Sequence, residues 1–112
     1  MKYRMAMMNC VIFMTRDELA RIHAGKNDDE IMVDLHGLTE REARRFLRNL
    51  IACMKTKFSI FVVHGYRHGT VIKDMIRERN SGISRRVIRV DPCEWNPGAT
   101  TMVIDDMPGT AA

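Results

Sequence analysis

A strand, a helix and a second strand follow one another in the middle of the chain, and this order limits the possible folds more than any other feature. In Ile31–His36, alternate side chains are apolar, as in a β-strand with one buried face. Thr39 and Glu42 have the spacing of a helical capping box, and apolar residues then recur at helical intervals to Met54. Phe58–Val63 is a nearly continuous apolar run, which predicts a strand buried on both faces of a parallel sheet. Together these segments predict a βαβ unit.

The segments on either side of this unit complete an α/β pattern. They predict the helix Thr15–Ala24, a helix from Val71 to Gly82, and the strands Arg85–Val90 and Thr100–Asp105. The order β-α-β-α-β-β, with an N-terminal helix before it, predicts an α/β two-layer sandwich in which helices cover a mixed sheet. We expect an N-terminal extension with a short helix at 1–25, one domain at 30–106 and a C-terminal tail at 107–112.

Length and composition indicate one domain in a reducing compartment. A chain of 112 residues can bury a sizeable core without disulfides or metals. Its three cysteines, Cys10, Cys53 and Cys93, lack the spacing of a disulfide framework or a zinc site, so we predict no metal, no cofactor and a cytoplasmic location. The apolar N-terminal run is too short to span a bilayer and has no small-residue cleavage site, so we expect neither a membrane segment nor secretion. A net charge of +4 is compatible with a polyanionic partner.

Polar side chains stand at the ends of both strands of the predicted βαβ unit. Asp34 and His36 share one face of the first strand, and His64 follows the second. Each histidine precedes a glycine, and a helix begins a few residues later. Ligands bind beyond the carboxyl ends of parallel strands, where the backbone amides of helix N-termini favour anions. If the two strands are neighbours, the three side chains gather over a phosphate site.

These residue types suit phosphodiester chemistry. Two imidazoles can serve as base and acid near neutral pH, and a carboxylate can orient one ring and hold its charged form. The predicted catalytic residues are therefore Asp34, His36 and His64. Arg67 and Lys73 are placed to contact phosphate oxygens, and Tyr66 could stack on a base or a ribose.

The same residues also have structural interpretations. A strand-end histidine before glycine is more often a turn residue with satisfied hydrogen bonds, and Asp34 could cap the helix that begins near Thr39. His64 and His68 are four positions apart but flank a loop, which argues against a metal-binding pair. Trp95 could stack on a base, although a tryptophan beside Asn-Pro-Gly more often closes the edge of a core.

Three segments form a recognisable set. They are VDLHGLTEREA (33–43), VVHGYRHGTVIKDMI (62–76) and NPGATTMVID (96–105). Together they resemble the small MutS-related domain, Smr, over roughly Ile31 to Asp105 and in the order that this family shows. The first segment is the most specific, because an apolar strand, D-L-H-G and a capped helix start seldom coincide.

The resemblance implies a β-α-β-α-β-β fold that binds nucleic acid and cuts or nicks it, with branched DNA as the substrate of some members and mRNA at stalled ribosomes that of others. The family's D-x-H motif matches Asp34 and His36. Its H-G-x-G element begins at His64, but Arg67 stands where many members have glycine. The nucleic-acid-binding residues predicted on this basis are Gly37, Gly65, Tyr66, Arg67, His68, Gly69, Thr70 and Lys73.

The leading hypothesis is a metal-independent endonuclease that acts on RNA or on flexible or branched nucleic acid. Asp34 would orient His36, and His64 or His68 would be the second proton donor. RNA is the easier substrate because its 2′-hydroxyl is an internal nucleophile, whereas DNA cleavage needs an external water and usually a metal. The alternatives are a non-catalytic module that docks on nucleic acid or a ribosome, and a regulatory domain that binds a small phosphorylated metabolite.

Overall fold

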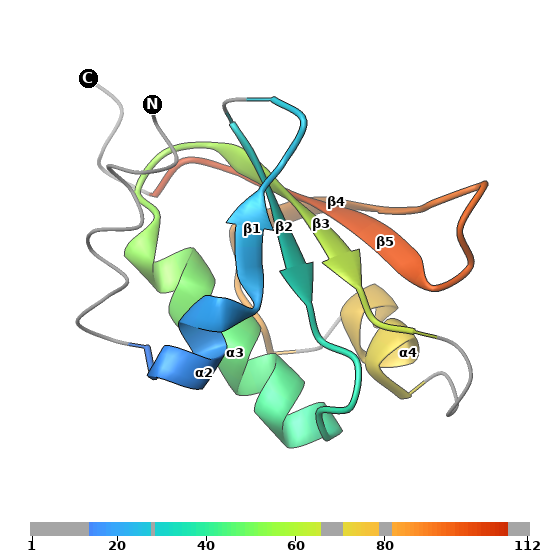
Figure 1. Ribbon diagram of the computed structural model, residues 1–112. Helices are drawn as coiled ribbons and strands as arrows, with labels where there is room; N and C mark the ends of the chain where they lie inside the picture. The colour runs from blue at the N-terminus through green and yellow to red at the C-terminus, as the bar shows by residue number, and fades with distance from the viewer. Residues whose placement is uncertain (1–13, 28, 66–70, 79–81, 108–112) are drawn as a thin grey trace.

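A mixed sheet with helices packed on one face makes up the part of the chain that the computed structural model describes, residues 14–27, 29–65, 71–78 and 82–107 (Figure 1). Its elements are α2 (Arg16–Ala20), β1 (Ile22–Ala24), β2 (Glu30–Asp34), α3 (Glu40–Cys53), β3 (Phe58–Val63), α4 (Val71–Arg77), β4 (Val87–Pro92) and β5 (Ala99–Ile104). The strand order is β1-β2-β3-β5-β4. The predicted α/β arrangement of helices against a mixed sheet is confirmed. None of the helices in these ranges is long and apolar enough to cross a membrane.

The predicted βαβ unit forms the centre of the sheet. Strands β2 and β3 pair in parallel, with Ile31 opposite Ile60 and Asp34 opposite Val63, and α3 connects them. The Leu35 amide extends this pairing by donating to the Val63 carbonyl at 2.8 Å. On the other side of β3, β5 pairs antiparallel. Both polar strand ends of the unit therefore lie at the same edge of the sheet.

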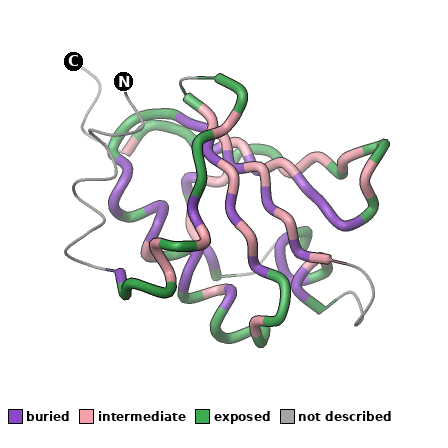
Figure 2. The backbone as a smooth tube through the Cα atoms, viewed as in Figure 1, coloured by how far each residue is buried: buried purple, intermediate pink, exposed green. Residues whose placement is uncertain are grey.

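The core lies between one face of the sheet and the helices. Ile31 and Val33 of β2 and Ile60 and Val62 of β3 are fully buried, while the residues between them are only half-buried (Figure 2). Helix α3 covers them with Ala43, Phe46, Leu47, Leu50, Ile51 and Cys53. Each large apolar side chain buried in this way contributes about 1.5–3 kcal/mol to folding.

The expectation that both faces of β3 are buried is wrong. Along this strand, buried residues alternate with the half-buried Ser59, Phe61 and Val63. The physical reason is that α3 and α4 cover one face only, and that β3 pairs with an antiparallel strand on one side (Figure 1). The opposite face of the sheet is left accessible.

The predicted helix Thr15–Ala24 is too long. Its capping box is present, because Thr15 Oγ1 accepts from the Glu18 amide while Glu18 accepts from the Thr15 amide, but α2 ends at Ala20. Residues Ile22–Ala24 instead form β1, antiparallel to β2. Without β1, the outer edge of β2 would present unpaired backbone groups, and Ile22 would not reach the core where it is buried. The sheet therefore includes residues within the predicted N-terminal extension at 1–25.

The C-terminal strands are shifted by one or two residues from their predicted bounds. β4 begins at Val87 rather than Arg85 and β5 at Ala99 rather than Thr100, with an irregularity in their pairing between Val87 and Arg89. The helix predicted to run from Val71 ends earlier than Gly82, at Arg77.

Arg86 is buried just before β4 and joins three separate segments. Its guanidinium donates to the carbonyls of Ile51 in α3 (2.6 Å), of Asp105 after β5 (2.9 Å) and of Thr56 before β3 (3.4 Å). Burial lowers the pKa of Arg86, although the nearby Asp106 and Asp105 act in the opposite direction. The charge also lies at the C-terminal end of α3, where the helix dipole favours a cation.

Replacing Arg86 with methionine should lower the free energy of unfolding by about 3 kcal/mol, because three backbone carbonyls lose their charged donor in a buried position. Urea denaturation of the variant beside the wild type measures this loss. The exposed neighbour provides the control: Arg85→Met should stay within about 0.5 kcal/mol of the wild type. An Arg86→Met protein as stable as the control would contradict the structural role.

Candidate functional site

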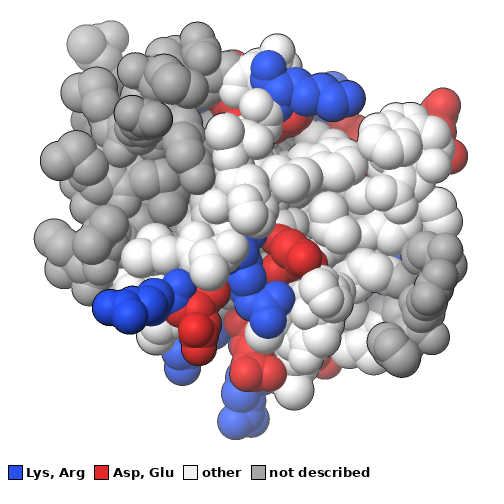
Figure 3. Space-filling model, viewed as in Figure 1, with Lys and Arg blue, Asp and Glu red and all other residues white. Residues whose placement is uncertain are grey.

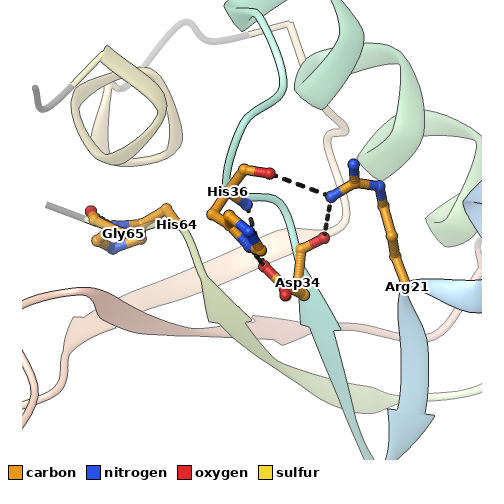
Figure 4. Close-up of polar contacts among 5 residues, drawn as sticks. All are labelled: Arg21, Asp34, His36, His64 and Gly65. Atoms are coloured by element: carbon orange, nitrogen blue, oxygen red, sulfur yellow. Dashed lines mark hydrogen bonds and ion pairs between the residues drawn. The ribbon is translucent and has the colours of Figure 1, made fainter. Parts of the chain in front are cut away.

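The carboxyl ends of β2 and β3 bring the two His-Gly segments together. Gly65 follows β3 with φ +76°, and a Cβ placed on it would lie 3.6 Å from the Cβ of His36. Gly37 has φ +83° and lets the chain turn away after β2 toward α3. Asp34, His36 and the backbone of Gly65 therefore share one small region at the edge of the sheet (Figure 4).

Asp34 and His36 form a tight pair at this edge. The Asp34 Oδ1 atom lies 2.5 Å from His36 Nδ1 and also accepts from the His36 amide at 3.1 Å. The histidine side chain is 70% exposed and that of Asp34 36%. Because Nδ1 faces the carboxylate, Nε2 lies on the far side of the ring and can reach a molecule in solvent. This is the arrangement of an oriented general base.

The carboxylate of this pair is held in its ionised form. Partial burial acts to raise the pKa of Asp34, but the hydrogen bonds from the His36 side chain and amide, with the charges of His36 and Arg21, lower the pKa below its usual value. Asp34 is therefore negatively charged throughout the neutral range, where it can stabilise an imidazolium.

Arg21 holds the backbone of this pair by hydrogen bonds, a role that the sequence did not predict. Its Nη1 donates to the carbonyl of Asp34 at 2.9 Å and to that of His36 at 3.2 Å (Figure 4). Arg21 stands between α2 and β1, and its own carbonyl accepts from the Asp34 amide at 3.0 Å. No local pattern in the sequence indicates this role. It depends on the pairing of β1 with β2, and the sequence predicts a helix over the residues of β1.

His64 occupies a different environment from His36. It is 6% exposed, its Nδ1 donates to the Gly65 carbonyl at 2.9 Å, and its Nε2 accepts from the Thr100 hydroxyl at 2.9 Å. These partners assign the Nδ1–H tautomer. Burial lowers the pKa of His64, helped by the charges of Lys73 and Arg77 and opposed by the bond to Gly65. Its role as a proton donor stays a prediction, and it would first have to give up one of these bonds.

Several backbone amides near the site donate to groups within the protein. At the start of α3, the Thr39 and Glu42 amides bond within the capping box, and Glu40 and Glu42 place negative charge in the first turn. The amides of His64 and Gly65 both donate to the Gly98 carbonyl, at 2.8 and 3.0 Å. The phosphate site that the sequence predicts at the α3 N-terminus stays a prediction, and the negative charges of Glu40 and Glu42 would act against it.

The remaining predicted residues divide into two groups. Lys73 lies half-buried on α4, close enough for its charge to act on His64. Tyr66, Arg67, His68, Gly69 and Thr70 lie outside the described residues. Within the described ranges, no group of three or more His, Cys, Asp or Glu side chains is arranged to hold a metal ion.

Comparison with known proteins finds no match to a family model, to a curated protein or to a solved structure. The function must therefore be argued from the geometry of this chain.

The environment of His64 predicts a pH-dependent stability. In the unfolded chain a histidine titrates near pH 6.5, whereas His64 in the folded protein titrates lower. Above pH 6.5 the His64 ring is neutral in both the folded and the unfolded chain, so its full contribution to the free energy of unfolding is present. As the pH falls below 6.5, the unfolded chain takes up the proton first and stability is lost, by about 1.4 kcal/mol per pH unit at most.

The stability advantage of the wild type over His64→Gln should consequently shrink between pH 7.5 and pH 5.5. Thermal unfolding at both pH values measures it, with His23→Gln as the control because His23 is exposed on β1. A constant difference for His64→Gln across this range would show that the ring is not held neutral.

Proposed function

We propose that the chain is an Smr-like endonuclease that cuts RNA, or flexible single-stranded parts of nucleic acid, without a metal ion. The observation that carries the proposal is the contact of 2.5 Å between Asp34 Oδ1 and His36 Nδ1 in a pair whose imidazole is open to solvent. The D-x-H motif and the β-α-β-α-β-β order support it, because both are features that the Smr resemblance implies.

In this proposal His36 is the general base of an internal transesterification. Its Nε2 removes the proton of a ribose 2′-hydroxyl, O2′ attacks the adjacent phosphorus, and the bond from phosphorus to O5′ breaks. The products are a 2′,3′-cyclic phosphate and a 5′-hydroxyl, whose oxygen takes up a proton from an acid or from water. Asp34 keeps the ring oriented and stabilises the imidazolium as it forms.

The substrate preference follows from the nucleophile. RNA carries its own 2′-hydroxyl beside the scissile phosphate, so positioning and proton removal are sufficient for attack. DNA lacks this group and would require an activated external water. Lys73 and Arg77 of α4 add positive charge on one side of the site. Their charges act on His64 and would favour a phosphate nearby.

A second candidate is a module that binds nucleic acid or a ribosome without cutting. It is favoured by the surroundings of His64, whose two ring nitrogens are both hydrogen-bonded within the protein. If no other residue protonates the leaving oxygen, the site would hold phosphates but turn over poorly.

End-labelled single-stranded RNA and DNA of the same sequence should be incubated with the full chain in EDTA. RNA should be cut to cyclic-phosphate ends and DNA left intact. His36→Ala should lower the rate at saturating RNA by about 10²–10⁴-fold, the usual contribution of a general base. Asp34→Asn should lower it as well, because the carboxylate no longer stabilises the imidazolium.

His23→Ala is the matched control for these variants, since it removes another exposed histidine and should cut at the wild-type rate. Cutting by His36→Ala at that rate, or cutting that EDTA abolishes, would contradict the mechanism. If the wild type and all variants bind RNA equally and none cuts it, the result would support the non-catalytic binding module.

A further inference from the structure

The open face of the sheet carries an exposed aromatic pair. Trp95, in the connection between β4 and β5, stacks on Phe61 of β3, with ring centroids 6.1 Å apart and an interplanar angle of 18°. Lys26 Nζ lies 5.7 Å from the centroid of the tryptophan ring. Trp95 is 72% exposed, so it does not close the edge of the core, as the more common structural interpretation would have it.

These residues line a broad groove of about 830 Å³ on the face that the helices leave uncovered. The groove is bounded by Met32 and Phe61 on the strands, by Lys26 near β1, and by Trp95 and Arg89 on the side of β4. Figure 3 shows a wide area without charged side chains over β3 and β5, with both basic and acidic side chains along its border. The aromatic rings in this groove suit the face of a planar ring.

The aromatic pair lies on the same face as the acid of the candidate site. Met32 is paired with Phe61, and the next pair on this face is Asp34 with Val63. Asp34 therefore follows Met32 by two residues along β2, a separation of about 7 Å. One strand of nucleic acid is long enough to contact both the groove and the pair formed by Asp34 and His36.

The charges of the groove favour a neutral group over a phosphate. Its lining contains two basic side chains, Lys26 and Arg89, and three acidic ones, Glu30, Asp91 and Glu94. Arg89 is already paired with Asp91 at 2.6 Å. With the charges nearly balanced, the distinctive property of this surface is its aromatic face rather than its potential. A nucleobase meets that property, because every base has a flat π-face.

We propose that this groove is a base-stacking subsite, in which one nucleobase of single-stranded RNA stacks on Trp95 beside the cut made at His36. The subsite rests on the proposed function for its substrate class. It would also give the protein a preference for unpaired over duplex RNA, since a base within a duplex cannot present its face.

Trp95 itself reports on the proposal, because it is the only tryptophan in the chain. Titrating a short oligouridylate into the His36→Ala protein, in EDTA, should quench the tryptophan fluorescence with a saturable curve, as stacking on the ring requires. Using His36→Ala keeps the RNA intact, so the measurement does not depend on whether the protein cuts.

Variants then measure the contribution to binding in the same background, by anisotropy of labelled RNA. Trp95→Ala should weaken binding about tenfold, the usual value of one stacked base, without changing the salt dependence that phosphate contacts set. Trp95→Phe should recover most of the affinity. Ile88→Ala, which removes another exposed apolar side chain, is the control and should bind normally.

The possible results separate this proposal from the nuclease. Quenching and weaker Trp95→Ala binding with no cutting by the wild type would support the subsite and contradict the nuclease. Cutting by the wild type, with no quenching and unchanged Trp95→Ala binding, would overturn the subsite alone. The subsite is also overturned if the oligouridylate does not bind. It is likewise overturned if the protein is a dimer in solution and Trp95→Ala converts it to monomers, because the groove would then be an interface between two copies of the chain.

Discussion

The parallel pairing of β2 with β3 is the constraint on which the rest of the molecule depends. Its register places Asp34 opposite Val63, so the chain leaves both strands at the same edge of the sheet. A parallel pair requires a long crossover, and α3 provides it while burying the apolar face of both strands. The same connection that builds the core therefore also positions the residues of the candidate site.

Two similar sequence segments acquire opposite properties at this edge. Both are a histidine followed by a glycine with positive φ, yet His36 is exposed against a carboxylate while His64 is buried against a hydroxyl and a carbonyl. The difference comes from their neighbours in the sheet. On one side of β3 lies the six-residue β5, whose Thr100 hydroxyl bonds the ring of His64, whereas β2 lies between β3 and the short β1.

Local patterns in the sequence predicted the central elements well. The capping boxes at Thr15 and Thr39, the apolar face of α3 and the alternation in β2 all depend on residues close together in the chain. What the sequence did not reveal depends on distant contacts. Three features belong to this group: the pairing of β1 with β2, the hydrogen bonds from Arg21 and the burial of Arg86. Each joins segments that are far apart in the sequence. The contact between Asp34 and His36 was predictable because the two residues are only two positions apart in the chain, although β2 ends at Asp34 and His36 lies in the turn after it.

The two outer strands also determine how this sheet meets other chains. β1 has only three residues, and β4 combines an irregular register with Pro92, which lacks an amide to donate. Long, regular edges invite strands from neighbouring molecules to extend the sheet, a common route to aggregation. In the part of the chain that the structure describes, both borders of the sheet are short or interrupted, which discourages such growth and leaves the open face accessible.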